Sequence, residues 1–83
     1  MTTETLVEAL ERGIVRMTYT KLNGEARQAT GTRHSSLVQG QVFAAPYALV
    51  DYWDLDADAW RSFYMDRVVS WEFVRTAEEE LAA

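Results

Sequence analysis

Two arginines in the C-terminal half of the chain could bind an anion. Arg61 and Arg67 lie six residues apart in the segment WRSFYMDRV, residues 60–68. In a straight strand, residues separated by an even number share a face, so both would lie beside Phe63. A planar guanidinium binds phosphate through two parallel hydrogen bonds, and an aromatic ring can stack on a nucleobase. The segment therefore predicts a pocket for a phosphate-bearing ligand, with Arg61 and Arg67 as anion contacts and Phe63 as the stacking ring.

Other residues are candidates for the same site. Tyr64 and Trp53 could add stacking surface beside Phe63, and Arg33 could close the site from a polar loop. This loop also carries His34 and two serines within the segment TRHSS. That set could cradle a phosphate or form an ordinary polar loop, and both interpretations remain open.

A structural role for the arginines is the alternative. Arg61 could form ion pairs across an adjacent acidic turn, whose carboxylates belong to Asp54, Asp56 and Asp58. Asp66 and Arg67 could likewise hold the turn that follows. The aromatic residues could form core and cross-strand packing, because aromatic side chains bury large areas in a small domain. Replacing both arginines by Gln separates these roles: a binding role predicts loss of ligand with the fold retained, and a structural role predicts loss of thermal stability.

The residue content excludes several kinds of site. The chain has no cysteine, so neither a disulfide nor a thiolate metal site can form. Its single histidine, His34, cannot supply a multi-histidine metal site or a two-histidine mechanism. No glycine-rich phosphate loop and no catalytic spacing occur. We therefore expect no enzymatic activity, no cofactor and no bound metal.

Charge is unevenly distributed along the sequence. The net charge of −5 argues against general nucleic-acid binding, because phosphate contacts need clustered Lys and Arg. Both ends are acidic, whereas residues 12–53 carry five basic and two acidic residues, a net charge of +3. The positive charge of residues 12–53 favours a phosphate ligand. The negative charge of the whole chain favours an adaptor that binds another protein through its helix and acidic ends. Solvation of the surface alone also explains such charge runs.

The sequence gives no sign of membrane insertion or export. No apolar run approaches the roughly 18 residues needed to span a membrane. The N-terminal residues lack the basic and then apolar pattern of a signal peptide. We expect a soluble cytoplasmic protein with no membrane partner.

An amphipathic helix is predicted at about residues 3–12. Thr5 and Glu8 have the spacing of a capping box, in which each side chain accepts from the other residue's backbone. Gly13 is expected to end the helix in the left-handed conformation. The apolar side of so short a helix must pack on the rest of the domain.

A first hairpin is predicted after the helix. Residues 14–20 alternate between apolar and polar side chains, which is typical of a half-buried strand. The pair Asn23 and Gly24 predicts a type I′ turn, because both central positions of that turn need positive φ. The returning strand, residues 25–32, is polar and rich in threonine, which indicates an exposed or edge position.

A second hairpin and a final strand are predicted further along. Residues 33–46 lack a clear pattern, and so long a loop is usually functional or mobile. Three more strands are expected at residues 47–53, 60–65 and 68–74. An acidic turn at residues 54–58 joins the first two, because short acidic side chains bond their own backbone. Alternation in the last strand places one set of side chains on a common face: Val69, Trp71 and Phe73.

These elements indicate a mainly β fold, a small SH3-like or Sm-like barrel of about five antiparallel strands preceded by an α-helix. Five short strands bury a common face only if the sheet curls, and closure also removes exposed edges. We expect one domain at residues 1–83. Its parts are a helix at about 3–12, a barrel at about 14–75 and an acidic, frayed tail at 76–83.

The sequence resembles the WYL domain in three segments. RSFYMDRV, residues 61–68, is similar to the family's arginine-x-phenylalanine-x-leucine-aspartate-arginine-isoleucine element. YALVDYWD, residues 47–54, occupies the place of the tripeptide that names the family, with Leu49 identical. MTYTKLNGEARQ is similar to the family's first hairpin. The resemblance runs from about residue 14 to 73, nearly the whole expected fold.

VDYWDLDADAWRSFYMDRVVSWE, residues 50–72, is similar to the central hairpin of the compact WYL-like proteins of tailed phages, which are Sm-like or SH3-like barrels. This similarity implies a phage or prophage protein that acts in the bacterial cytoplasm. In WYL regulators, a barrel separate from the DNA-reading domain senses a nucleotide or nucleic-acid ligand through arginines. The resemblance therefore implies a non-enzymatic regulatory or host-interaction role, with a nucleotide-type ligand or nucleic acid bound by the barrel alone. An adaptor or inhibitor of a host protein, including host-defence components, is the alternative. Strand-edge pairing into a homo-oligomer is also expected, with the subunit number left open.

Overall fold

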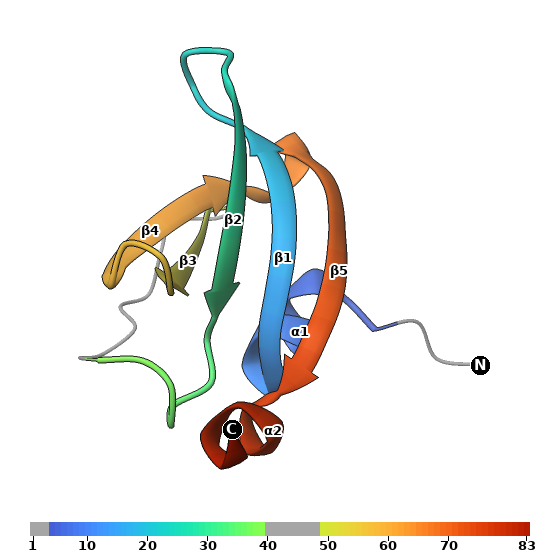
Figure 1. The fold of residues 1–83 in the computed structure, drawn as a ribbon. Coiled ribbons are helices and arrows are strands. Elements are labelled where there is room, and N and C mark those ends of the chain that lie inside the picture. The colour runs from blue at the N-terminus through green and yellow to red at the C-terminus, as the bar shows by residue number, and fades with distance from the viewer. Residues whose placement is uncertain (1–3, 40–48) are drawn as a thin grey trace.

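Five antiparallel strands form one sheet in the order β4-β3-β2-β1-β5 (Figure 1). The computed structural model describes residues 4–39 and 49–83. The strands are β1 (Gly13–Thr20), β2 (Ala26–Thr32), β3 (Leu49–Asp54), β4 (Ala59–Tyr64) and β5 (Val68–Thr76). Helix α1 (Leu6–Arg12) precedes them, the 3-10 turn η1 (Met65–Arg67) joins β4 to β5, and α2 (Ala77–Ala82) follows. The prediction of a mainly β fold with an N-terminal helix is confirmed.

Helix α1 begins with the predicted capping box. The Glu8 amide donates to Thr5 Oγ1 at 3.1 Å, and the Thr5 amide donates to Glu8 Oε1 at 3.1 Å. The left-handed end predicted for Gly13 is wrong, because its φ of 176° is extended and the residue already belongs to β1. A glycine is needed there for space: a Cβ would overlap the Arg75 carbonyl oxygen and lie 2.8 Å from Thr76 Cα.

The β1–β2 hairpin differs from the prediction in its turn. Of the two residues predicted to be central, Asn23 and Gly24, only Gly24 has positive φ, at 91°, so the turn is not type I′. The Gly24 amide donates to the Lys21 carbonyl at 2.9 Å, and the Glu25 amide donates to Asn23 Oδ1 at 3.0 Å. A turn followed by one positive-φ glycine therefore closes the hairpin.

Strand β2 is central in the sheet, so its predicted edge position is wrong, whereas its predicted exposure is correct for part of the strand. It pairs with β1 along its whole length but with β3 at only two positions, Gly31 and Thr32. Its N-terminal half, beyond β3, stays exposed, which explains the polar sequence. At Gly31, a Cβ would overlap the ring of Tyr52, so this glycine lets β3 approach closely.

Strand β5 carries two bulges that change which side chains face the core. The register shift between Thr18 and Tyr19 leaves Val69 without a partner on β1. Val68 therefore lies opposite Tyr19 and packs on the core, whereas Val69 is 67% exposed. The predicted common face of Val69 with Trp71 and Phe73 is wrong, because one extra residue reverses the alternation.

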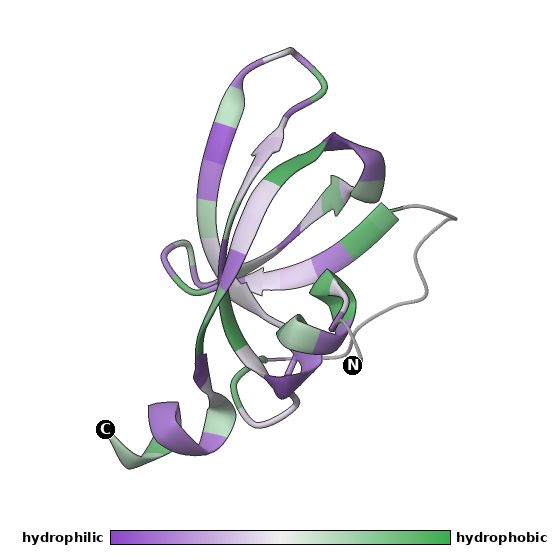
Figure 2. Ribbon diagram, turned by 90° about the vertical axis from the view of Figure 1, so that its right-hand side faces the viewer, coloured by the Kyte–Doolittle hydropathy of each residue, from purple (hydrophilic) through white to green (hydrophobic). Residues whose placement is uncertain are grey.

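The C-terminal acidic segment does not fray as predicted but forms α2. Thr76 and Glu79 make a second capping box, with the Glu79 amide donating to Thr76 Oγ1 at 3.1 Å. Ala77 is buried, whereas the middle of α2 is hydrophilic (Figure 2). The spacing of threonine and glutamate that predicts α1 occurs here too.

The core lies between the curled sheet and α1. Among the described residues, it contains a cluster of nine buried ones: Leu6, Ala9, Leu10, Val15, Met17, Tyr19, Ala29, Tyr52 and Phe63. The C-terminal end of α1 is tied to the end of β2, because the Arg33 amide donates to the Leu10 carbonyl at 2.8 Å. Among the residues that the structure describes, no helix has both the length and the apolar character needed to cross a membrane.

Candidate functional site

A groove of about 640 Å³ opens between the β1–β2 hairpin and β4. One wall is made by residues 19–23 and Arg27, and the other by Leu49, residues 60–62 and Tyr64. The groove exists because β2 and β3 pair only at one end, so the hairpin and β4 diverge from there (Figure 1).

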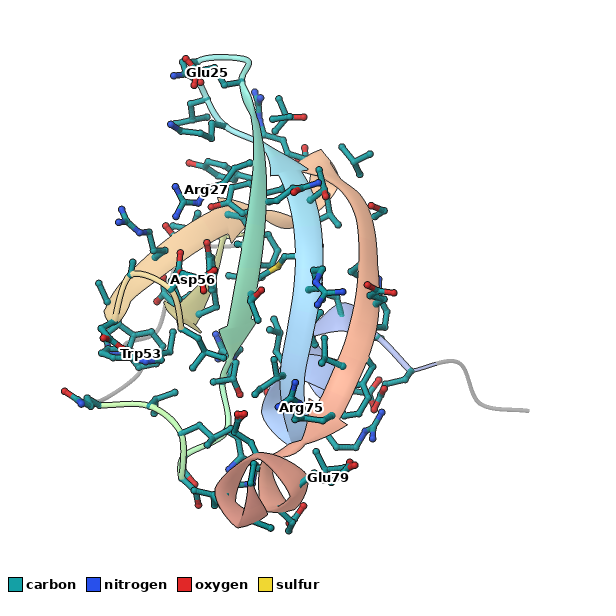
Figure 3. The ribbon with its side chains drawn as sticks, in the orientation of Figure 1. Glu25, Arg27, Trp53, Asp56, Arg75 and Glu79 are labelled. Carbon is teal, nitrogen blue, oxygen red and sulfur yellow. The ribbon has the colours of Figure 1, made fainter. Side chains whose placement is uncertain are left out.

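Three cationic side chains line this groove, in a protein whose net charge is −5. Lys21 comes from the hairpin turn, Arg27 from β2 and Arg61 from β4. The side chains of Arg27 and Arg61 are 31% and 47% exposed, respectively. Figure 3 shows Arg27 extending from β2 on the side of β4. The site is therefore a local concentration of positive charge that water can reach.

Asp54 lies beneath the two arginines. Its side chain is 1% exposed, and its Oδ2 atom is 2.8 Å from Arg27 Nη2 and 3.9 Å from Arg61 Nε. Its other oxygen, Oδ1, accepts from the amides of Asp56 and Ala57 at 3.0 and 3.1 Å. Burial raises the pKa of Asp54, but the Arg27 hydrogen bond and the two amides outweigh it, so the pKa lies below its ordinary value. The carboxylate is thus held ionised.

Two tyrosines and a phenylalanine form the layer behind the groove. The hydroxyls of Tyr19 and Tyr52 are 2.9 Å apart, and burial raises the pKa of Tyr52. The ring of Phe63 lies 5.4 Å from that of Tyr19 and 5.6 Å from that of Tyr52, between ring centroids. Phe63 was predicted to stack on a ligand, but it is 2% exposed and has no open ring face. Tyr64, also predicted, is 38% exposed and lines the groove.

The two arginines first predicted to bind an anion do not meet in the groove. Arg61 lines it, but Arg67 belongs to η1, where Nη1 donates to the Lys21 carbonyl at 3.4 Å. The prediction assumed one straight strand through residues 60–68, and η1 breaks that strand. Arg61 also has one partner that the structural alternative named, Asp54.

Trp53 and Arg33 lie outside the groove lining. Trp53 is buried against Trp60 in an edge-to-face pair, with ring centroids 5.6 Å apart. Arg33 Nη1 donates to the backbone carbonyl of Asp51. In the neighbouring loop, the His34 ring accepts from the Ser36 amide at 3.1 Å. This loop is thus bonded to itself and to β3, and residues 40–46 of the predicted loop lie outside the described residues.

Lys21 and Arg27 were missed as site residues. A signal for Arg27 was present, because the hairpin register places it opposite Tyr19, on the face that carries the core. A charged residue on that face needs a buried partner, and Asp54 supplies it. Within the part of the chain that the structure describes, no cluster of His, Cys, Asp or Glu side chains could hold a metal ion.

Comparison with known proteins supports the fold. A comparison with curated proteins and one with solved structures gave no match. The model of the WYL_2 family, described as an Sm-like SH3 beta-barrel fold, matches residues 3–69. This match spans α1, the first four strands and η1, so it includes every groove residue named above. The chain belongs to the WYL_2 family of Sm-like SH3 β-barrels.

Proposed function

We propose that this barrel binds a nucleotide-type ligand or nucleic acid in the groove, with Lys21, Arg27 and Arg61 as its phosphate contacts. The observation that carries the proposal is the convergence of three cations from separate elements on one groove. Their mutual repulsion costs free energy, and the single buried Asp54 offsets only part of it. A bound phosphate supplies the missing negative charge through charge-assisted hydrogen bonds.

The aromatic side chains of the groove support a base-bearing ligand. Tyr64 and Trp60 line the same wall as Arg61. Trp60 is held in place because its Nε1 donates to the Gln39 carbonyl at 2.7 Å. A fixed indole and an exposed phenol can stack on a base of any sequence. The proposed role is non-catalytic, regulatory or host-directed, as the phage resemblance implies.

The proposal is tested by binding measurements on matched variants. ATP and a short oligothymidylate are titrated into the protein by calorimetry, and native mass spectrometry examines protein purified gently from a bacterial host. Arg61→Gln and Lys21→Gln are expected to weaken binding about tenfold each, because each removes one charge-assisted contact. Arg16→Gln is the matched control, since Arg16 pairs with Glu72 and lies outside the groove lining. Equal losses in all three variants, or no binding by the wild type, would refute the proposal.

A protein adaptor is the second candidate, favoured by α2. Leu81 is 61% exposed on this helix, directly after the three glutamates 78–80. An apolar side chain beside acidic ones suits a basic, amphipathic partner surface. Charge reversal at Glu11 and Glu78 tests it best, because Glu4 and Glu8 support α1 through Arg12 and the capping box. Capture of the same host protein by wild type and reversed variant would count against this candidate.

A further inference from the structure

We infer that Asp54 is the positioning residue of the groove: its buried carboxylate fixes Arg27 by a hydrogen bond and attracts Arg61, so that an anion meets both guanidinium groups in the groove. This inference rests on the proposed function. It assigns a role to a residue that is absent from the groove lining and that therefore acts through the two arginines.

The contacts of Asp54 divide between its two oxygens. Oδ1 is occupied by the amides of Asp56 and Ala57, which fix the carboxylate on the β3–β4 turn. Oδ2 remains for the arginines, at 2.8 Å from Arg27 and 3.9 Å from Arg61. Because Oδ1 is bonded to two backbone amides and Oδ2 to Arg27, the buried carboxylate has little freedom to rotate. The fold therefore sets the direction in which Oδ2 points.

The two arginines come from strands that are not neighbours in the sheet. Arg27 is on β2 and Arg61 on β4, with β3 between them. Two guanidinium groups repel each other, and without a shared counter-charge they would point apart into water. Asp54, at the end of β3, is the group that both approach. It therefore determines where their positive charges lie relative to the groove.

The unequal distances predict unequal roles for the arginines. Arg27 makes a charge-assisted hydrogen bond to Asp54, and its Nε is buried without a hydrogen-bond partner among the described residues. Arg61 is beyond hydrogen-bond distance from Asp54 and more exposed. Arg27 thus supplies a fixed charge, whereas Arg61 can move to grip the anion without breaking a hydrogen bond to Asp54.

Substitution Asp54→Asn distinguishes positioning from simple charge competition. The amide keeps an acceptor oxygen for the turn amides but removes the negative charge. If Asp54 only competes with the ligand for the arginines, ATP binding should strengthen in Asp54→Asn, because the substitution removes a negative charge that repels the ATP phosphates. If Asp54 positions them, ATP binding should weaken about tenfold despite the more positive groove.

Asp56→Asn is the matched control, with the same charge change on an exposed side chain of the same turn. Among the described residues Asp56 makes no ion pair, so its substitution should change ATP affinity less than about twofold. Asp54→Ser provides a second uncharged variant that keeps an acceptor oxygen in a smaller side chain. Thermal melting identifies any variant that fails to fold.

Nitrogen NMR of the arginine Nε–H groups gives a readout without ligand. In the wild type we expect the Arg27 side chain to be ordered, and in Asp54→Asn or Asp54→Ser to become mobile. Mobile arginines with weaker ATP binding support the inference. Unchanged arginine order, or tighter ATP binding in a folded Asp54 variant, overturns it. Failure of the wild type to bind ATP counts against the proposed function instead, and the arginine order still decides whether Asp54 positions these groups.

Discussion

At Gly31 the side chain of Tyr52 packs directly against the backbone of β2. The ring of Tyr52 occupies the position that a Cβ at residue 31 would take. Tyr52 in turn bonds Tyr19 and packs on Phe63, so the glycine supports the layer behind the groove. A single missing methyl group therefore determines how the aromatic layer fits against β2.

Gly31→Ala is expected to destabilise the fold by about 2 kcal/mol through overpacking, as measured by urea denaturation. Gly24→Ala is the comparison, because residue 24 has φ of 91° with open space around it. There the cost of about 1 kcal/mol comes from backbone strain alone. Equal stability of Gly31→Ala and wild type would contradict the role assigned to this glycine.

Asp54 links stability to pH with a definite sign. Its pKa is lower in the folded state than its ordinary value of 3.8, so the stabilisation is present above pH 3.8 and is lost as pH falls through the folded value. The exposed Glu4 and Glu79, whose pKa values are also lowered, act in the same direction. We expect the free energy of unfolding to fall more steeply below about pH 4 in the wild type than in Asp54→Asn. Parallel curves, from urea denaturation at each pH, would show that Asp54 has no such effect.

At the scale of elements, both helices begin with the same capping motif but differ in how much they pack on the core. Each has threonine as N-cap and glutamate at the third position. Helix α1 buries Leu6, Ala9 and Leu10, whereas α2 buries only Ala77. Most helical stability in proteins comes from packing, so the same capping loss should have different consequences at the two ends.

Thr76→Ala is expected to cost about 1 kcal/mol of local stability and to release the α2 amides to hydrogen exchange. Global stability should change little, because α2 contributes little to the core. Thr5→Ala, the matched change in α1, should lower the global free energy of unfolding by about the same 1 kcal/mol. Unchanged exchange of the α2 amides in Thr76→Ala would contradict the capping role.

Sequence patterns predicted what depends on neighbours along the chain. The alternation of Val15, Met17 and Tyr19 and the Thr5–Glu8 capping box need only local spacing, and both were correct. What depends on pairing between distant strands was not predicted. The bulge at Val69 arises from its register with β1, and the groove arises because β2 and β3 part after two pairs.

In the candidate site, too, local sequence predicted some residues, whereas contacts between distant strands determined the others. Arg61 and Tyr64 could be found from the sequence, because their residue types suit a phosphate and a base. Asp54 was also named, as one of three possible ion-pair partners of Arg61. Arg27 was missed, because it reaches the same carboxylate from β2, which is distant in the sequence. Arg67 was assigned to the site by counting along a strand that η1 interrupts.

At the scale of the whole molecule, charge is unevenly distributed between the two ends. The helices α1 and α2 lie near one end of the barrel, and the β1–β2 hairpin, which carries one wall of the groove, extends from the other (Figure 1). The two helices hold five of the thirteen acidic residues and one basic residue, Arg12, whereas the described groove lining holds three cations and no acidic residue. Such a distribution orients an approaching anion toward the groove and disfavours binding elsewhere.

Salt dependence measures how many phosphates the groove contacts. With three cations, the logarithm of the oligothymidylate association constant should fall against the logarithm of salt concentration with a slope of about −2. Arg61→Gln should reduce the magnitude of the slope by about 0.7, the contribution of one phosphate on a single strand. A slope steeper than about −4 would place the binding surface beyond these three residues.

The Trp53–Trp60 pair gives the groove an intrinsic spectroscopic signal. Its indole rings are 5.6 Å apart at an interplanar angle of 79°, which is close enough for their electronic transitions to couple. Trp60 lines the groove and Trp53 does not, so one member of the coupled pair touches whatever enters. A ligand that contacts Trp60 therefore changes the circular dichroism of this exciton pair. The signal follows occupancy of the groove in real time, in the unlabelled protein and without a reporter dye.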